Sequence, residues 1–217
     1  MTPDTRRMAS TVRSLKSLLP TAVSVALLTA LTGCGGGSDG HALPSAKTVG
    51  DVQKFITRAG LPCTALSNDP LGAPGAPAEG FISPTYHGYS GADFKEETKA
   101  DAAKWSVKEG AACGKDNSDA GGWVIYLTKD MKTFQQAYRD DVRKSVRSSE
   151  SDPTLRRGTY LVGADFTVDP TASLQDNPLL QTDLRVLNCY PDLKVPSGYS
   201  VQPALVEGCV LTDYVPE

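Results

Sequence analysis

The chain has 217 residues with 22 basic and 25 acidic side chains, which gives a formal net charge of −3. Four of the basic residues and one of the acidic residues precede Cys34, so 18 basic and 24 acidic side chains follow it. This balance lacks the excess of positive charge with which proteins hold nucleic acid, so no nucleic-acid partner is expected. The segment after residue 47, about 170 residues, is long enough for one domain with its own hydrophobic core.

The first 33 residues have the order of a secretory signal, in which basic residues precede a short apolar stretch. That stretch runs from Leu18 to Leu31 and would extend about 21 Å as a helix, short of the roughly 30 Å hydrocarbon core of a bilayer. We therefore expect a signal peptide over residues 1–33 and not a membrane-spanning helix. Both Met1 and Met8 suit the start of such a signal, and the sequence leaves the route of export open.

The residues Leu31-Thr32-Gly33-Cys34 resemble the lipobox of bacterial lipoproteins. In that family the cysteine thiol receives a diacylglycerol, the signal is cut just before it, and the new amino group is often acylated. The resemblance implies that Cys34 carries lipid and holds the protein at the outer face of the cell membrane. Residues 34–47 are rich in Gly, Ser, Pro and Ala, which predicts a flexible tether behind the lipid.

Four further cysteines follow the tether: Cys63, Cys113, Cys189 and Cys209. An even number in a protein outside the cytoplasm predicts two disulfides, for which three pairings are possible. Pairing of sequence neighbours is favoured, and it gives Cys63–Cys113 and Cys189–Cys209. We expect these bonds to be structural, because no two cysteines have the close spacing of a typical redox pair.

No metal or cofactor is expected. None of the cysteines lies in a CxxC motif, and the two histidines, His41 and His87, are not near any cysteine pair, which argues against zinc. The segment Gly114–Gly122 (GKDNSDAGG) is similar to a calcium loop in composition. It lacks the alternating ligand spacing and the final glutamate of an EF-hand, so a turn is the better interpretation.

Residues 48–60 (TVGDVQKFITRAG) predict the first helix. Thr48 and Asp51 fit a capping box, apolar side chains recur at helical spacing, and Gly60 suits the position just after the last turn. Residues 67–91 are rich in Pro and Gly and are expected to be irregular.

Residues 92–109 are strong helix formers, although the end near Trp105 suits a strand as well. The clearest strand is 121–128 (GGWVIYLT), which is apolar and partly β-branched. A helix over 129–147 should follow, with Asp130 as its cap.

Residues 158–168 (GTYLVGADFTV) predict another strand. If it is a parallel neighbour of the strand before the helix, the three elements form a right-handed crossover. A short helix is expected within 170–187, broken or bent at Pro178, and a closing strand over 204–214. The sequence therefore predicts a single small α+β domain with a mixed sheet, two or three flanking helices and two disulfides.

The stretches GLPC (60–63), WVIYLTKD (123–130) and LVGADFTV (161–168) resemble small secreted lipoproteins of actinobacteria. The resemblance covers most of residues 48–217 and rests on pattern, without a catalytic motif. Most proteins of this kind have no assigned activity, so the resemblance implies a fold and a location and adds little on chemistry.

The segment HGYSGA, which begins at His87, comes nearest to a nucleophile signature. It offers Ser90 as nucleophile, His87 as base and Asp93 as the acid behind the base. Ala92 replaces the second glycine of the Gly-x-Ser-x-Gly elbow, and no apolar strand precedes it. A loop with one exposed histidine is the simpler interpretation of these weak candidates.

Other polar groups suit a solvated surface. The pairs Glu96-Glu97 and Asp140-Asp141 lie on expected helices, where adjacent side chains diverge and so do not form a catalytic pair. The basic side chains after Tyr138 are expected on the outer face of their helix, with contact to anionic lipid headgroups as the less favoured alternative. Several tyrosines lie in expected loops and could line a binding surface: Tyr86, Tyr89, Tyr190, Tyr199 and Tyr214.

The sequence thus favours a lipid-anchored extracytoplasmic protein whose domain is a non-catalytic binding or accessory module of the cell envelope. Its partners would be the membrane, through the lipid on Cys34, and an envelope protein or cell-wall component. The alternative is a small envelope hydrolase with His87 and Ser90 in its site. A hydrolase predicts titratable groups that converge in a cleft, whereas a binding module predicts an exposed, tyrosine-bearing patch without perturbed titratable groups.

Overall fold

The computed structural model describes residues 42–64, 66, 94–114, 122–148, 154–170 and 174–217. Within these ranges it contains four α-helices and one 3-10 helix. They are α1 (Val49–Arg58), α2 (Phe94–Lys104), α3 (Met131–Ser148), α4 (Thr154–Arg157) and η1 (Pro178–Gln181).

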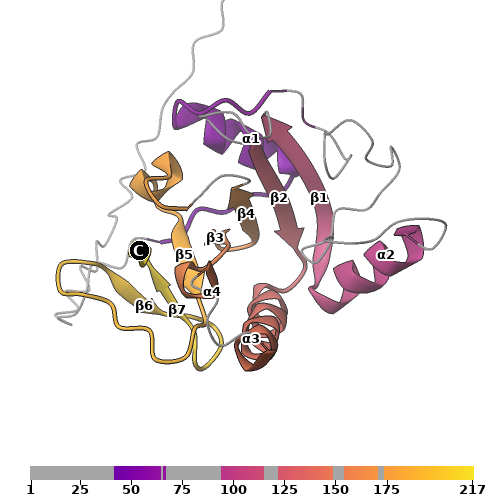
Figure 1. The fold of residues 1–217 in the computed structure, drawn as a ribbon. Coiled ribbons are helices and arrows are strands. Elements are labelled where there is room, and N and C mark those ends of the chain that lie inside the picture. Colours follow the sequence, from indigo (N-terminus) through magenta and orange to yellow (C-terminus); the bar gives the residue numbers. More distant parts are fainter. Residues whose placement is uncertain (1–41, 65, 67–93, 115–121, 149–153, 171–173) are drawn as a thin grey trace, which may run out of the picture. The chain divides into compact units, whose positions relative to one another are not determined.

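Seven strands form one sheet in the order β1-β2-β4-β3-β5-β7-β6 (Figure 1). They are β1 (Val107–Gly114), β2 (Gly122–Thr128), β3 (Leu161–Val162), β4 (Phe166–Pro170), β5 (Arg185–Asn188), β6 (Val201–Pro203) and β7 (Val210–Thr212). The prediction of a single α+β domain is confirmed. The prediction of a mixed sheet is wrong, because all six neighbouring pairs of strands are antiparallel.

The sheet differs from the prediction because residues 158–168 contribute to two strands, β3 and β4, instead of one. After β3 the chain turns at Gly163, where a Cβ would lie 2.6 Å from the carbonyl oxygen of Pro44, and it returns as β4. β4 inserts between β2 and β3 and is antiparallel to both. The strands before and after α3 therefore run in the same direction but are not neighbours, so the expected crossover is split by β4.

Helix α1 begins and ends as its sequence predicts. The Thr48 hydroxyl accepts a hydrogen bond from the backbone N–H of Asp51 at 3.2 Å, and the Thr48 N–H donates to the Asp51 carboxylate at 3.0 Å. This is the capping box, and it satisfies two backbone donors that a helix start leaves free. Gly60 follows the last turn with a φ of +79°, a backbone conformation that glycine adopts at low cost.

Two other expected helices differ in extent. α2 ends at Lys104, and after the turn at Ser106 the strand β1 begins, so the strand alternative for the end of residues 92–109 is confirmed. Among the described residues between 170 and 187, which leave out 171–173, only η1 is helical. Pro178 is at its first turn and starts it, where a proline without an N–H costs little.

Helix α3 follows its predicted pattern closely, and the closing strand follows it in part. The Asp130 carboxylate accepts a hydrogen bond from the Thr133 N–H at 2.9 Å, which confirms Asp130 as the cap of α3. The closing strand is shorter than the expected 204–214, because β7 covers only Val210–Thr212 and pairs with β6 as well as β5.

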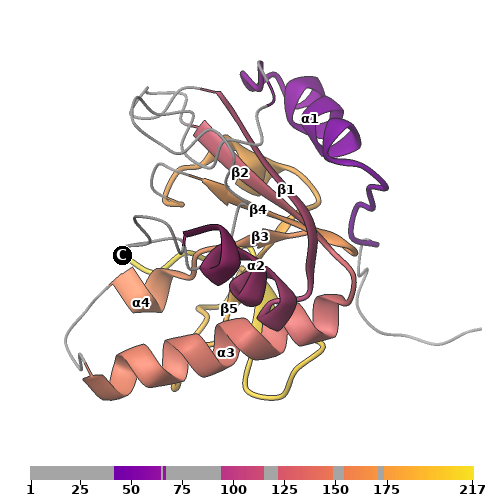
Figure 2. The same cartoon turned by 90° about the vertical axis from the view of Figure 1, so that its right-hand side faces the viewer.

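In Figure 2, α1 lies on one side of the sheet and α2 and α3 on the other, and a hydrophobic layer lies on each side. α1 covers one face, and we call this layer the α1-side core; its central residues include Val52, Ile56, Trp123, Ile125 and Phe166. α2 and α3 cover the other face, and this layer is the α3-side core; its central residues include Trp105, Tyr126, Phe134, Tyr160 and Leu187.

Both predicted disulfides are confirmed. Cys63–Cys113 joins the segment after α1 to the end of β1 and lies in the α1-side core, and Cys189–Cys209 joins the residue after β5 to the residue before β7 in the α3-side core. They close loops with sequence separations of 50 and 20 residues. On the chain-entropy account they stabilise the fold by about 4 and about 3 kcal/mol.

The residues just before α1 are held against the turn between β3 and β4. Asp165 accepts hydrogen bonds from the Ser45 hydroxyl and, at 2.7 Å, from the Ala46 N–H, and the Ala164 N–H donates to the Pro44 carbonyl at 2.8 Å. Residues 42–47 lie within the span expected to be a flexible tether. The structure shows that the folded part of the chain begins before Thr48.

Candidate functional site

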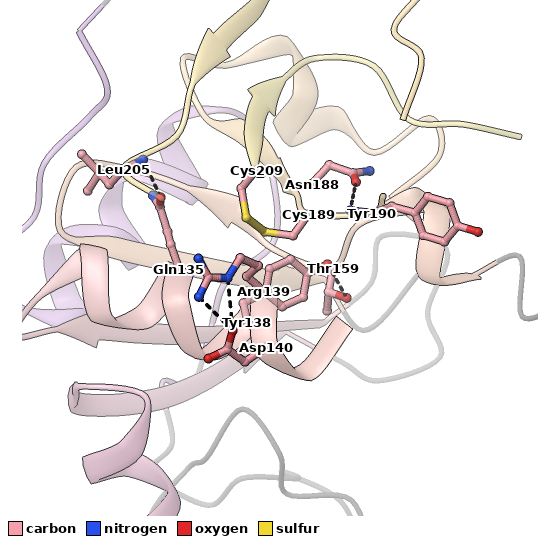
Figure 3. Close-up of a disulfide and its surroundings, with 10 residues drawn as sticks. All are labelled: Gln135, Tyr138, Arg139, Asp140, Thr159, Asn188, Cys189, Tyr190, Leu205 and Cys209. Atoms are coloured by element: carbon pink, nitrogen blue, oxygen red, sulfur yellow. Dashed lines mark hydrogen bonds and ion pairs between the residues drawn. A yellow bond between two sulfur atoms is a disulfide. The ribbon is translucent and has the colours of Figure 1, made fainter. Parts of the chain in front are cut away.

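A hollow of about 500 Å³ lies beside the Cys189–Cys209 disulfide. We call it the groove. Its lining comes from α3, from the end of β5 and the loop that follows, and from β6 and β7, so segments far apart in the sequence meet there (Figure 3). The disulfide itself forms part of the lining and ties two of these segments together.

Asn188 fixes one end of the groove. Its side chain is buried, and the amide Nδ2 donates to the Arg156 carbonyl at 2.7 Å. Oδ1 accepts from the Tyr190 N–H at 2.9 Å (Figure 3). Asn188 therefore connects α4 to the loop after β5. Because Nδ2 and Oδ1 each make a hydrogen bond to the backbone, we assign Asn188 the role of holding the loop in place.

Tyr190 lines the groove close to a positive charge. The guanidinium carbon of Arg156 lies 5.4 Å from the centroid of the Tyr190 ring, and Arg156 Nε lies 3.4 Å from the Tyr190 hydroxyl. This is the geometry of a cation–π contact. The contact places Arg156 beside the groove without making it a lining residue.

Arg143 brings a second positive charge, from α3. Its side chain reaches Gly208, where a Cβ would lie 2.9 Å from Arg143 Nη2, and the φ of Gly208 is +82°. Within the described ranges no hydrogen bond or ion pair engages the Arg143 guanidinium. Arg139, one turn earlier on α3, differs because it binds the Asp140 carboxylate at 2.9 Å.

The rest of the groove is mainly apolar, with one acidic side chain, Asp192. Its apolar lining residues include Pro191, Leu193, Val195, Val201 and Val210. Val201 is half exposed, at 51%. The site thus combines apolar walls, one guanidinium and one carboxylate, and the structure shows no ion pair between those two charges.

A second region with unusual chemistry lies in the α3-side core. Five aromatic side chains pack there with ring centroids 5.2 to 6.4 Å apart, and each is at most 5% exposed. We call this set the aromatic cluster: Trp105, Tyr126, Phe134, Tyr138 and Tyr160. The rings fill the space between one another, so they form packed core and not an open cage for a cation.

Asp169 lies on β4 beside the aromatic cluster. It is opposite Val124 in the sheet, and Thr167, two residues earlier on the same strand, is opposite Tyr126, which places both β4 side chains on the α3 face. Asp169 is only partly exposed, and desolvation by the surrounding protein raises its pKa to about 7. A carboxyl group in this environment changes its charge near neutral pH.

The tyrosines near Asp169 respond to the same environment. Burial raises the pKa of Tyr138 to about 12, and it raises those of Tyr126 and Tyr160 well above the usual value, with the Asp169 charge as a further cause. Two buried polar atoms of this region have no hydrogen-bond partner within the described ranges: Thr167 Oγ1 and Trp105 Nε1. Asp169 is therefore a titratable group with a perturbed pKa. The interpretation as a binding module predicted no such group in its exposed patch.

The weak catalytic candidates His87, Ser90 and Asp93 lie outside the described residues, as do the lipidation residue Cys34 and the centre of the calcium-like segment at 115–121. Glu96 and Glu97 lie on α2, but their side chains are not among those described. Across the described ranges, no group of three or more His, Cys, Asp or Glu could hold a metal ion.

Other predicted surface residues are visible. Asp140 is exposed and paired with Arg139, so the interpretation of this acidic pair as surface charge holds for Asp140. Tyr199 is 49% exposed and contacts the partly buried Tyr214, with ring centroids 4.9 Å apart. Tyr86 and Tyr89 lie outside the described residues.

Sequence reasoning missed the groove and Asp169. The alternation in Phe166–Pro170 could have shown that Thr167 and Asp169 share one face, but not that this face is enclosed. For the groove, the glycine before Cys209 was the available local signal, since glycine often marks a close approach of another group.

Among the helices that the structure describes, none is both long enough and apolar enough to cross a membrane. The chain matches no protein-family model, no curated protein and no solved structure.

Proposed function

We propose that the protein is a lipid-anchored, extracytoplasmic binding or accessory domain of the cell envelope, and that the groove is its binding surface. The observation that carries the proposal is the groove itself, a hollow of about 500 Å³ whose lining the Cys189–Cys209 disulfide holds together. Ligand pockets in proteins commonly have volumes of roughly 300 to 1,000 Å³. A mostly apolar hollow with few charges, tied together by a disulfide, has the features of a binding site.

The cysteines support the proposed location. Four of the five form two structural disulfides, which persist in oxidising compartments outside the cytoplasm. Cys34 is the fifth, and it stands directly after the apolar stretch of the expected signal peptide. Lipid attachment at Cys34 and export of the domain are thus parts of one proposal.

The lining of the groove favours binding over catalysis. Its two cysteines are bonded to each other, its asparagine is engaged with the backbone, and its ionisable lining residues include one guanidinium and one carboxylate. Covalent catalysis needs a nucleophile with a base in hydrogen-bond reach. The lining residues contain no such pair, so we propose no reaction for the groove.

The anchor is tested by Cys34→Ala in the natural host. We expect the unchanged protein to incorporate radiolabelled palmitate and to fractionate with the membrane. The variant should incorporate no label and should leave the membrane fraction. A variant that is still labelled, or an unchanged protein that takes up no label, would show that Cys34 is not the attachment point.

The binding surface is tested by a photo-cross-linking residue placed at Val201, which lines the groove and is 51% exposed. The matched control is the same residue at Leu205, which is 56% exposed and is not a lining residue. After irradiation of intact cells, we expect an adduct of an envelope component at Val201 and none at Leu205. Identical adducts at both positions, or none at Val201, would contradict the assignment of the groove.

A further inference from the structure

We infer that the groove binds a small organic monoanion, a carboxylate with an apolar body, and that Arg143 receives the carboxylate. The inference rests on the proposed function, because it names the ligand class of the same groove. Its first support is the position of the Arg143 guanidinium. In the structure Nη2 of Arg143 packs against Gly208, where a Cβ would lie 2.9 Å from it, so the guanidinium lies next to Cys209 of the disulfide.

The Arg143 guanidinium is available to a ligand. It carries five N–H donors in a planar fork that matches a carboxylate with two parallel hydrogen bonds. Within the described ranges it has neither a hydrogen bond nor an ion pair, whereas Arg139 on the same helix is held by Asp140. A ligand that reaches Arg143 therefore displaces no described carboxylate from it.

The other charges near the groove limit the ligand to one negative charge. Asp192 is also a lining residue, so a second negative charge on the ligand would approach a like charge. Arg156 lies over Tyr190, its guanidinium carbon 5.4 Å from the ring centroid, and adds positive potential at the rim. A cationic ligand would meet two arginines, and a doubly charged phosphate would meet Asp192.

The apolar lining residues of the groove favour a ligand with an apolar part. The side chains of Leu193, Val195, Val201 and Val210 line the groove together with the disulfide. Burial of apolar area is favourable by about 25 cal/mol per Å², and it distinguishes a ligand with a hydrocarbon or aromatic body from acetate or a free inorganic ion. A guanidinium and apolar walls in the same lining thus select the same class of molecule.

The test uses fluorine NMR of four matched probes with the full chain in detergent, and protein-free detergent as the blank. The probes are 4-fluorobenzoate, 4-fluorobenzyl alcohol, 4-fluorobenzylamine and 4-fluorophenyl phosphate, which share an aromatic body and differ in charge. We expect the benzoate to bind about tenfold more tightly than the alcohol, since a charge-assisted hydrogen bond contributes roughly that factor. The amine and the phosphate should bind more weakly than the benzoate.

The variant Arg143→Gln should weaken benzoate binding about tenfold and leave the alcohol unchanged. Arg147→Gln, one turn further along α3 and not a lining residue, is the matched control and should leave both unchanged. Equal binding of benzoate and alcohol, no binding of any probe, or equal effects of the two variants would overturn the inference. Tighter binding of the phosphate would overturn the monoanion assignment. In each of these cases an adduct at Val201 would still support the groove as a binding surface.

Discussion

The groove and the aromatic cluster both include side chains of α3, yet their charged groups differ in exposure to solvent. In the groove, Arg143 is exposed to solvent, while at the aromatic cluster Asp169 is partly buried and desolvation raises its pKa to about 7. The disulfide holds the lining of the groove, and packed rings hold the cluster. We therefore expect that some substitutions alter ligand binding and others alter the stability of the core. Substitutions at four places test this expectation.

The largest effect is expected in the aromatic cluster. Phe134 is fully buried and contacts Trp105 and Tyr160, so Phe134→Ala should lower the free energy of unfolding by about 3 to 5 kcal/mol. Urea titration measures the change. Phe134→Leu should cost less, and it keeps the protein folded if the alanine variant is too unstable. The folded leucine variant should bind 4-fluorobenzoate as tightly as the unchanged protein does. A weakened affinity would show that packing in the aromatic cluster affects binding in the groove.

Removal of the second disulfide should affect the groove as well as stability. The pair Cys189→Ala and Cys209→Ala should lower the free energy of unfolding by about 3 kcal/mol and weaken benzoate binding, because the lining segments lose their link. The matched control removes Cys63 and Cys113, which should cost about 4 kcal/mol and leave benzoate binding intact. Similar losses of binding in both double variants would mean that general stability, and not the local link, shapes the groove.

Asp169 should make stability depend on pH. Its pKa is about 7 in the folded protein against a reference of 3.8, so the folded state binds a proton that the unfolded state releases. This contribution is present at low pH and is lost as the pH rises from about 4 through 7. Because Asp169 is partly exposed, we expect a decrease of about 1 to 2 kcal/mol between pH 5 and pH 8, below the full value for such a shift.

The variant Asp169→Asn should remove this part of the pH dependence and be more stable than the unchanged protein at pH 8. Asp183→Asn, at an exposed position before β5, is the control and should leave the pH dependence as it was. Urea titrations at pH 5, 6, 7 and 8 measure both. If Asp169→Asn and the unchanged protein lose stability in parallel over this range, the enclosure of Asp169 is not the cause.

The smallest change in stability is expected at Val201. Because this side chain is 51% exposed, Val201→Ser should alter the free energy of unfolding by less than about 0.5 kcal/mol. It should still weaken benzoate binding, since Val201 lines the groove. Leu205→Ser, at a similar exposure outside the lining, should change neither property. If Val201→Ser binds benzoate as tightly as the unchanged protein, the Val201 side chain is not part of the binding site.

Local signals in the sequence predicted much of the fold. The capping pair of Thr48 and Asp51, the cap at Asp130 and the pairing of neighbouring cysteines each depend on residues close in the chain or on a simple order. The split of residues 158–168 into two strands could not be predicted in the same way. Its turn at Gly163 lies between two short apolar runs that could also belong to one strand, and only the insertion of β4 beside β2 distinguishes the two arrangements.

The candidate site was less predictable than the fold. Arg143, Asn188, Val201 and Gly208 come from four separate segments, and no spacing in the sequence indicates that they meet. Arg143 was expected on an outer helix face, which is where it lies, but its contact with Gly208 could not be predicted from the sequence. The pKa of Asp169 likewise depends on how α3 and the neighbouring strands enclose it, and not on its own strand.

The order of the disulfides along the chain bears on how such a protein would mature. Cys63 pairs with Cys113 and Cys189 pairs with Cys209, so each cysteine bonds to the next one and the two closed loops do not overlap. A chain that is exported N-terminus first would present Cys113 to Cys63 before either of the last two thiols arrives. If lipid already occupies Cys34, no competing thiol is present at that stage. Oxidation in order of arrival would then yield the native bonds without reshuffling.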